Sequence, residues 1–170
     1  MLFRSFNTTG DVIMLGQSTY PYITGYRWSN STGFGTQYGQ PPANGFNQYF
    51  KGQNIAFSPD GKYVAIGFGL DVFDSPNTVW PFYVFNWDVS TGFGSYLTWP
   101  TAISGSTMPI GSYGCTAVMF TKSGDALIIG NQSGYVFAWR WTSSGFGTQY
   151  ASPSPAYVAT AIWDASIYST

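Results

Sequence analysis

Apolar and polar residues follow the same order three times along this chain. In each unit, two short runs rich in apolar residues flank a polar turn, at positions 6–13, 57–64 and 120–127. Each turn holds a glycine, which adopts the positive φ of tight hairpin turns. These glycines are Gly10, Gly61 and Gly124. Asp60 and Asp125 are typical turn residues because the carboxylate binds nearby backbone. The pattern predicts three β-hairpins, with a structural role for both aspartates.

A third run, rich in β-branched and aromatic residues, follows each hairpin and carries a tryptophan at its end. Such a composition favours a packed strand. The runs are 23–28, 82–87 and 135–141, with Trp28, Trp87 and Trp141 at their ends. A Gly-Phe-Gly phrase comes next, and we expect it to turn the chain into a fourth, shorter strand. The phrase consists of Gly33, Phe34 and Gly35, then Gly92, Phe93 and Gly94, then Gly145, Phe146 and Gly147.

The fourth run of each unit is polar and ends in prolines. These prolines are Pro41, Pro42, Pro100, Pro153 and Pro155. Because proline has no backbone N–H, a strand that ends in it is expected at the outer edge of a sheet. Each unit is therefore predicted to be a four-stranded antiparallel sheet. The phrase recurs with phenylalanines at 34, 93 and 146, a spacing typical of β-propeller blades.

The repeat predicts an all-β fold and one repeat domain over residues 1–170. The expected blades are residues 1–42, 43–101 and 102–155, with part of a fourth at 156–170. Closed propellers have four to eight blades, so three and a fraction are not expected to close alone. We expect oligomerisation or a partner chain to complete the ring, unless the chain is a piece of a longer polypeptide.

The stretch Phe-Ser-Pro-Asp-Gly-Lys-Tyr-Val-Ala-Ile-Gly at 57–67 resembles the inner hairpin of WD-repeat propeller blades. With the tryptophan, the Gly-Phe-Gly-Thr phrase and the closing prolines, it is similar to short propeller repeats of bacterial and bacteriophage proteins, among them virion and tail components. The resemblance implies the fold, whereas propellers serve many functions. The chain lacks the histidine of the usual WD pattern, although Trp87-Asp88 and Trp163-Asp164 are Trp-Asp pairs.

The amino-acid composition limits the kinds of partner that this chain is expected to bind. Hydrophobic residues make up 44% of the chain and aromatic ones 20%, which favours a packed core over disorder. Charged residues make up only 8%, so charge repulsion between copies is weak and association is expected. The six basic residues are scattered, which argues against nucleic-acid binding. No run of about 18 apolar residues predicts a membrane span, and the N-terminus does not resemble a signal peptide.

Candidate catalytic chemistry is sparse. Without histidine the chain has no imidazole base and no Ser-His-Asp triad. Cys115, at the start of a predicted inner strand, is expected to be a buried structural thiol rather than a nucleophile. Asp71, Asp74 and Asn77 in the longer loop 69–81 match no cation-loop spacing. We expect no catalytic residues, no metal and no cofactor.

The expected contact residues are aromatic. Phe73 and Trp80 in the loop 69–81, together with Trp99, are candidates for binding a neighbouring protein or a glycan. Trp28, Trp87 and Trp141 recur at one point of the period, which favours packing between blades over sugar stacking. No Arg, Asp or Glu stands beside the tryptophan at the same place in all three units to bind sugar hydroxyls. The Gly-Phe-Gly phrase has no following lysine or helix, so its expected role is architectural, with its phenylalanine tucked between blades.

These observations favour a non-enzymatic structural or interaction protein, and the resemblance to bacteriophage repeats implies a virion component of the tail, fibre or capsid surface. Expected partners are other copies of the chain or another virion or scaffold protein. The expected location is a virion or extracellular assembly. Two alternatives remain: an oligomeric carbohydrate-binding propeller of the lectin type, and a fragment of a bacterial surface or scaffold propeller.

Overall fold

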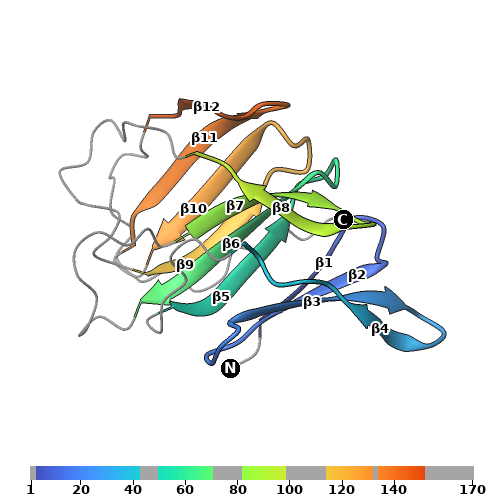
Figure 1. Cartoon of the computed structure of the whole chain (residues 1–170). Coiled ribbons are helices and arrows are strands. Elements are labelled where there is room, and N and C mark those ends of the chain that lie inside the picture. Colours follow the sequence, from blue (N-terminus) through green and yellow to red (C-terminus); the bar gives the residue numbers. More distant parts are fainter. Residues whose placement is uncertain (1–2, 43–49, 71–81, 99–113, 132–133, 152–170) are drawn as a thin grey trace.

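The computed structural model describes residues 3–42, 50–70, 82–98, 114–131 and 134–151, which form strands and no helix (Figure 1). The first sheet contains β1 (Phe3–Phe6), β2 (Val12–Gly16), β3 (Ile23–Ser29) and β4 (Gly33–Gln37). The second contains β5 (Phe50–Phe57), β6 (Tyr63–Leu70), β7 (Phe82–Asp88) and β8 (Gly92–Tyr96). The third contains β9 (Cys115–Phe120), β10 (Ala126–Asn131), β11 (Val136–Thr142) and β12 (Gly145–Gln149). None of these described segments is a helix long and apolar enough to cross a membrane.

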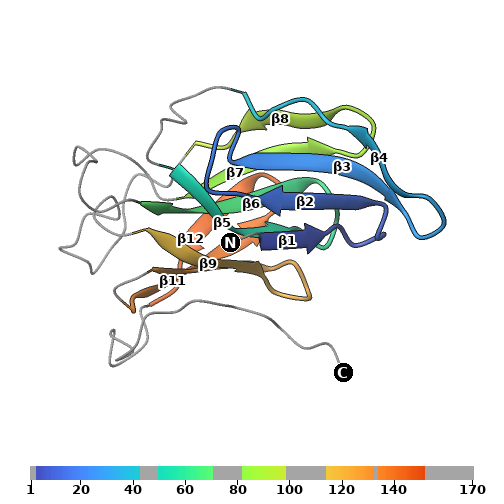
Figure 2. The same cartoon turned by 90° about the horizontal axis from the view of Figure 1, so that it is seen from below.

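Each sheet is an antiparallel meander in which neighbours in sequence are neighbours in space. The first strands of the three sheets lie side by side, with β5 in contact with both β1 and β9. The fourth strands lie at the opposite edges. This arrangement confirms the predicted all-β architecture of three four-stranded blades, and the sheets do not close into a ring (Figure 2). The predicted partial blade at 156–170 lies outside the described residues.

The three hairpins form as expected from their turn residues. Gly10, Gly61 and Gly124 have φ values of 73°, 70° and 73°. The N–H of each glycine donates to the carbonyl three residues earlier, at 2.9–3.1 Å. A residue with a β-carbon is strained in this left-handed region, so glycine fixes where each chain reversal occurs.

The Gly-Phe-Gly phrase differs from the expectation that it turns the chain. Only its first glycine is in the left-handed region, with φ of 75°, 90° and 101° at Gly33, Gly92 and Gly145. The phenylalanine and second glycine already belong to the fourth strand. A β-carbon at the second glycine would lie within about 3.3 Å of the bulged third strand: 3.3 Å from Arg27 Cβ, 3.1 Å from Asn86 Cβ and 3.1 Å from the Arg140 carbonyl oxygen. The second glycine is therefore needed where the third strand bulges toward the fourth.

The predicted proline ends of the fourth strands need a further correction. β4 ends at Gln37, before Pro41 and Pro42, and the N–H of the next residue, Tyr38, still donates to the Gly25 carbonyl of β3 at 2.9 Å. The other three prolines lie outside the described residues. The edge position of β4 is thus occupied by a strand that contains no proline.

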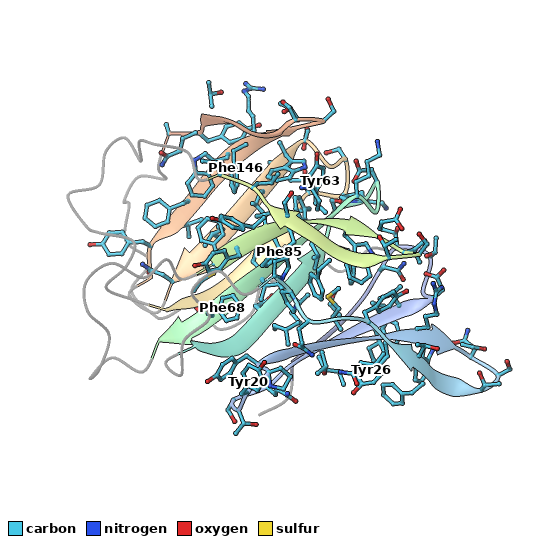
Figure 3. The ribbon with its side chains drawn as sticks, in the orientation of Figure 1. Tyr20, Tyr26, Tyr63, Phe68, Phe85 and Phe146 are labelled. Atoms are coloured by element: carbon cyan, nitrogen blue, oxygen red, sulfur yellow. The ribbon has the colours of Figure 1, made fainter. Side chains whose placement is uncertain are left out.

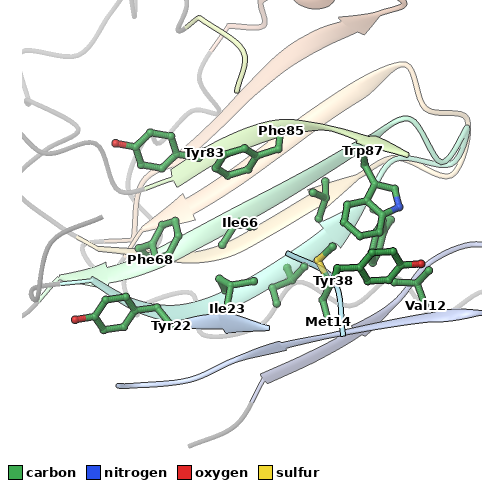
Figure 4. Packing of buried hydrophobic residues seen from close by; sticks show 13 residues of the cluster. Val12, Met14, Tyr22, Ile23, Tyr38, Ile66, Phe68, Tyr83, Phe85 and Trp87 are labelled. Carbon is green, nitrogen blue, oxygen red and sulfur yellow. The ribbon is translucent and has the colours of Figure 1, made fainter. Parts of the chain in front are cut away.

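Two hydrophobic cores lie between the three sheets. The first core joins the facing sides of the first and second sheets, and Figure 4 shows Val12, Met14 and Ile23 opposite Ile66 and Phe85. The second core joins the other face of the second sheet to the third sheet. The second sheet is therefore buried on both faces, whereas the first and third sheets each use one face in these cores.

The second and third sheets approach closely where Gly67 of β6 faces Cys115 of β9. A β-carbon at Gly67 would lie 2.8 Å from the Cys115 sulfur and 3.0 Å from its carbonyl oxygen. We expect Gly67→Ala to lower the free energy of unfolding by about 1–3 kcal/mol, because the added methyl group overpacks this joint. Chemical denaturation measures the change.

The matched control is Gly39→Ala, since an added β-carbon at Gly39 would meet nothing within 4 Å. It should change the free energy of unfolding by less than about 0.5 kcal/mol. Equal denaturation midpoints for Gly67→Ala and the wild-type chain would contradict the tight approach of the two sheets.

Candidate interaction surface

Each sheet carries a cluster of three aromatic rings, which we call its triad. The triad combines a phenylalanine from the end of the first strand, the tryptophan of the third strand and the phenylalanine of the Gly-Phe-Gly phrase. The first triad is Phe6, Trp28 and Phe34, the second is Phe57, Trp87 and Phe93, and the third is Phe120, Trp141 and Phe146. In every triad both phenylalanine rings meet the tryptophan edge to face, with ring centroids 5.1–5.7 Å apart. This geometry is favoured between aromatic rings, and it makes each triad a repeated structural unit.

The second and third triads are covered by the sheet that precedes them. Trp87 is 5% exposed and Trp141 is 7% exposed. The ring of Tyr38, from the first sheet, lies 4.9 Å from the ring of Trp87, and Figure 4 shows the two side by side. The ring of Tyr63, from the second sheet, lies 5.1 Å from that of Trp141. These two triads are therefore the joints between blades, and Phe93 and Phe146 pack against the cores there.

The first triad lies on the outer face of the first sheet and is open to solvent. Phe34 is 58% exposed and Phe6 is 43% exposed. Trp28 is half-buried, and its Nε1 donates to Asn30 Oδ1 at 3.1 Å. Tyr26, on the same outer face, adds a fourth ring 5.4 Å from Phe34 (Figure 3). The expectation that the phenylalanine of the phrase is tucked between blades is thus wrong for Phe34, because no described sheet lies against this face.

A tyrosine hydroxyl closes each joint. The Tyr38 hydroxyl donates to the Val89 carbonyl at 2.8 Å, and the Tyr63 hydroxyl donates to the Ser143 carbonyl at 2.9 Å. Burial raises the pKa of the Tyr38 phenol above its ordinary value, so the phenol stays neutral and keeps its donor proton. Val89 and Ser143 both lie two residues after the tryptophan of the third strand, so the acceptors are equivalent, whereas the donors differ: Tyr38 follows β4 and Tyr63 begins β6.

An arginine supports the first joint. The Arg27 guanidinium lies 5.5 Å from the centre of the Tyr38 ring, within cation–π range. Its Nη2 donates to the Ser90 carbonyl at 3.5 Å. The pair formed by Arg27 and Tyr38 thus contacts two successive carbonyls of the second sheet, and both residues were missed in the sequence. The repeated glycine phrase indicates the phenylalanines of the triads, and no pattern in the sequence marks Tyr38, the residue that follows β4.

The carboxylates of the described turns accept hydrogen bonds from residues of the same turn. Hydrogen bonds from Thr9 and Asn7 lower the pKa of Asp11, those from Ser90 and Thr91 lower that of Asp88, and those from Ser123 and Thr121 lower that of Asp125. Asp60 accepts a hydrogen bond from the Ser58 hydroxyl at 2.6 Å and from the Lys62 N–H at 3.1 Å. Each carboxylate is therefore engaged with neighbours in its own turn.

The structure offers few groups for chemistry. No group of three His, Cys, Asp or Glu side chains able to hold a metal ion occurs among the residues it describes. Phe73, Trp80 and Trp99, the contact candidates from the sequence, lie outside those residues, as do Asp71, Asp74 and Asn77. The exposed first triad is the candidate functional site of the part that is described.

Cys115 is fully buried at the joint of the second and third sheets, with its thiol 3.3 Å from the Ala117 carbonyl. Burial raises the pKa of this thiol to about 12. We expect native protein at pH 8 to resist a thiol-specific reagent, because the thiolate is the reactive form. Absorbance of the released reagent group should show one thiol only after denaturant is added. Labelling of native protein at the rate of a free cysteine would show that the joint opens or that the thiol is accessible.

Tyr38→Phe tests the tyrosine bond between blades. Loss of the hydrogen bond to the Val89 carbonyl is expected to lower the free energy of unfolding by about 0.5–1.5 kcal/mol. Chemical denaturation measures this difference, and Tyr20→Phe serves as control because Tyr20 is exposed. Equal losses in the two variants would mean that the Tyr38 hydroxyl contributes nothing specific to the joint.

No protein-family model and no curated protein matches this sequence. Solved structures do share its fold. A protein from Lactobacillus plantarum aligns over 88% of this chain and 41% of its own, with a TM-score of 0.58 and 15% identity. A candidate 6-phosphogluconolactonase from Bacteroides fragilis aligns over 86% of this chain and 36% of its own, with a TM-score of 0.55 and 18% identity.

The WD40 repeats of RRP9 are also similar, with a TM-score of 0.51 and 14% identity over 86% of this chain and 37% of that one. At these identities the likeness is one of fold. The chain spans about two-fifths of the length of the structures it matches. The described residues thus have the fold of three propeller blades, similar to WD40 proteins and to proteins named as lactonases, in an open arc.

Proposed function

We propose that this chain is a non-enzymatic structural and interaction protein, and specifically a bacteriophage virion component of the tail, fibre or capsid surface. The observation that carries the proposal is the exposed first triad. The same cluster of rings forms a joint between blades in the other two sheets, whereas no described sheet covers it on the first sheet. The WD40 neighbours support an interaction or scaffold role at the level of the fold.

The absence of suitable chemistry supports a role without catalysis. The chain contains no histidine and a single cysteine, and that cysteine is buried. The carboxylates of Asp11, Asp60, Asp88 and Asp125 bind the residues of their own turns. The similarity to candidate lactonases is one of fold and brings no active-site residue to this chain.

The virion role is supported by the repeat and by the surface. The Gly-Phe-Gly-Thr phrase resembles repeats of bacteriophage structural proteins, and 8% charged residues leave a neutral polar surface suited to permanent contacts. We propose a virion or extracellular assembly as the location. The partners are copies of this chain or another virion or scaffold protein.

Carbohydrate binding is a second candidate, favoured by one observation. The half-buried Trp28 and exposed Phe34 present two rings on an open sheet face, and aromatic faces stack on sugar rings. In this case the outer face of the first sheet would bind glycan without a second protein. Loss of glycan binding on Trp28→Ala, with the fold retained, distinguishes it from the scaffold role.

Purified particles test the virion role. Particles from the phage-producing culture that expresses this chain are banded on a density gradient and washed with salt. Peptide mass spectrometry is expected to find the chain in the particle band, at a fixed ratio to the major capsid protein. An abundant soluble host enzyme serves as control for trapped protein. Recovery of the chain only in the soluble fraction, together with that enzyme, overturns the virion assignment.

A further inference from the structure

The outer face of the third sheet carries an arginine–tyrosine pair that resembles the pair of Arg27 and Tyr38 at the joint between the first and second sheets. The Arg140 guanidinium lies 5.1 Å from the centre of the Tyr150 ring, as Arg27 does at 5.5 Å from Tyr38. The N–H of Tyr150 binds the Ala138 carbonyl at 2.9 Å, and the N–H of Tyr38 binds the Gly25 carbonyl at the same distance. Tyr150 is 37% exposed, whereas Tyr38 is buried against the second sheet. Tyr150 is therefore in the position of a joint tyrosine without a described sheet to contact.

The residues around Tyr150 also match those around Tyr38. Met14, Ile23 and Gly25 of the first sheet are buried against the second sheet. Their counterparts by strand register in the third sheet are Ile128, Val136 and Ala138, which are apolar and half-buried. We call Ile128, Val136, Ala138, Arg140 and Tyr150 the tyrosine face. It has the composition of the face that docks on a triad.

The first sheet carries the other half of such a joint. Its outer face, which we call the triad face, consists of Phe6, Trp28, Phe34 and the turn at Asn30 and Ser31. Asn30 and Ser31 correspond to Val89 and Ser90, whose carbonyls accept the bonds from Tyr38 and Arg27. The turn is exposed in the described structure.

The glycine that begins β4 points to the same missing contact. A β-carbon at Gly92 would lie 3.1 Å from the Tyr38 ring, and one at Gly145 would lie 2.8 Å from Leu97. Tyr38, Leu97 and Tyr150 occupy one position of the repeat, since the N–H of each binds the third strand of its own sheet. A β-carbon at the equivalent Gly33 would meet only Trp28 of its own sheet, at 4.0 Å. The space that Tyr38 fills beside Gly92 is thus open beside Gly33.

We propose that the triad face of one copy of this chain binds the tyrosine face of a second copy, head to tail. Tyr150 packs on Trp28 and Phe34, its hydroxyl donates to the Asn30 carbonyl, and Arg140 donates to the Ser31 carbonyl. The two faces lie at opposite ends of the arc with the second sheet between them, so the triad face does not contact the tyrosine face of the same chain (Figures 1 and 2). The inference rests on the proposed role in assembly and names the partner and the surface.

The number of blades sets the size of the assembly. The described residues of each chain form three sheets, so two copies bring six described sheets, within the four to eight blades of closed propellers, and three copies exceed that range. Head-to-tail contacts make a closed ring when the rotation between copies returns to the start. Two copies then form two identical joints. The net charge of −1 places little repulsion between them.

Native mass spectrometry and light scattering of the full chain over a dilution series test the proposal. The expected species has twice the 18.6 kDa mass of the chain. Phe34→Glu buries a charge in the joint and should raise the dissociation constant at least about 30-fold. Tyr150→Phe removes one hydrogen bond and should raise it about three- to tenfold. Tyr20→Glu is the control, because Tyr20 is an exposed aromatic residue that belongs to neither face, and it should leave the mass unchanged.

A mixing experiment tests the head-to-tail polarity. Phe34→Glu lacks a working triad face, and the double variant with Arg140→Gln and Tyr150→Ser lacks a working tyrosine face. Each alone should be a monomer, and circular dichroism should show that each is folded. Mixed together, with one copy isotopically heavy, they should form a hetero-dimer through the one joint that remains intact. If the triad face bound the triad face of another copy instead, the mixture would form no hetero-dimer.

Several outcomes overturn the inference. They are a folded monomer at every concentration of the wild-type chain, an oligomer unaffected by Phe34→Glu, and glycan binding at Trp28 without self-association. The particle assay of the virion role and the mass measurement of the dimer give independent results. A chain found in particles but monomeric keeps the virion role and removes the joint, whereas a dimer absent from particles keeps the joint and removes the virion role.

Discussion

The packing of an aromatic triad against the preceding sheet is the interaction on which the rest of this structure depends. A four-stranded sheet with apolar side chains on both faces is not stable alone in water, because the hydrophobic effect favours covering each face. The second sheet meets this constraint on both sides, through the cores that contain Trp87 on one face and Trp141 on the other. Among the described residues, the first and third sheets each meet it on one face, and their other faces are the ones that we propose bind a second copy.

The joint combines nonpolar burial with a small number of directed bonds. The indole nitrogens of Trp87 and Trp141 are buried without an acceptor among the described residues, whereas Trp28 donates to Asn30. Burial of an unpaired N–H has a cost, so the ring contacts must stabilise each joint by more than this cost. The hydroxyls of Tyr38 and Tyr63 then fix the register of one sheet on the next through backbone carbonyls. Carbonyl acceptors allow the turn sequences to vary while the joint is retained.

The internal repeat allows the exposed triad of the first sheet to be compared with two covered triads. An apolar patch alone has many explanations, but in the second and third sheets the same three rings lie against the preceding sheet. Phe34 corresponds to Phe93 and Phe146, which pack against the cores, and Tyr150 corresponds to Tyr38, which is buried. The described turns are built in a similar way, since Asp88 and Asp125 bind the hydroxyls and backbone around them.

The sequence by itself determined the strands, the hairpins and the three sheets that the structure describes. These features depend on short-range chemistry: positive φ at Gly10, Gly61 and Gly124, and apolar runs on both sides of each turn. Only the tertiary structure decided which equivalent residues are buried. Phe34, Phe93 and Phe146 stand in the same phrase, and their exposure differs because it depends on whether another sheet lies against them. The roles of Arg27 and Tyr38 were hidden for the same reason, since their contacts join residues 63 and 51 positions apart and leave no local pattern.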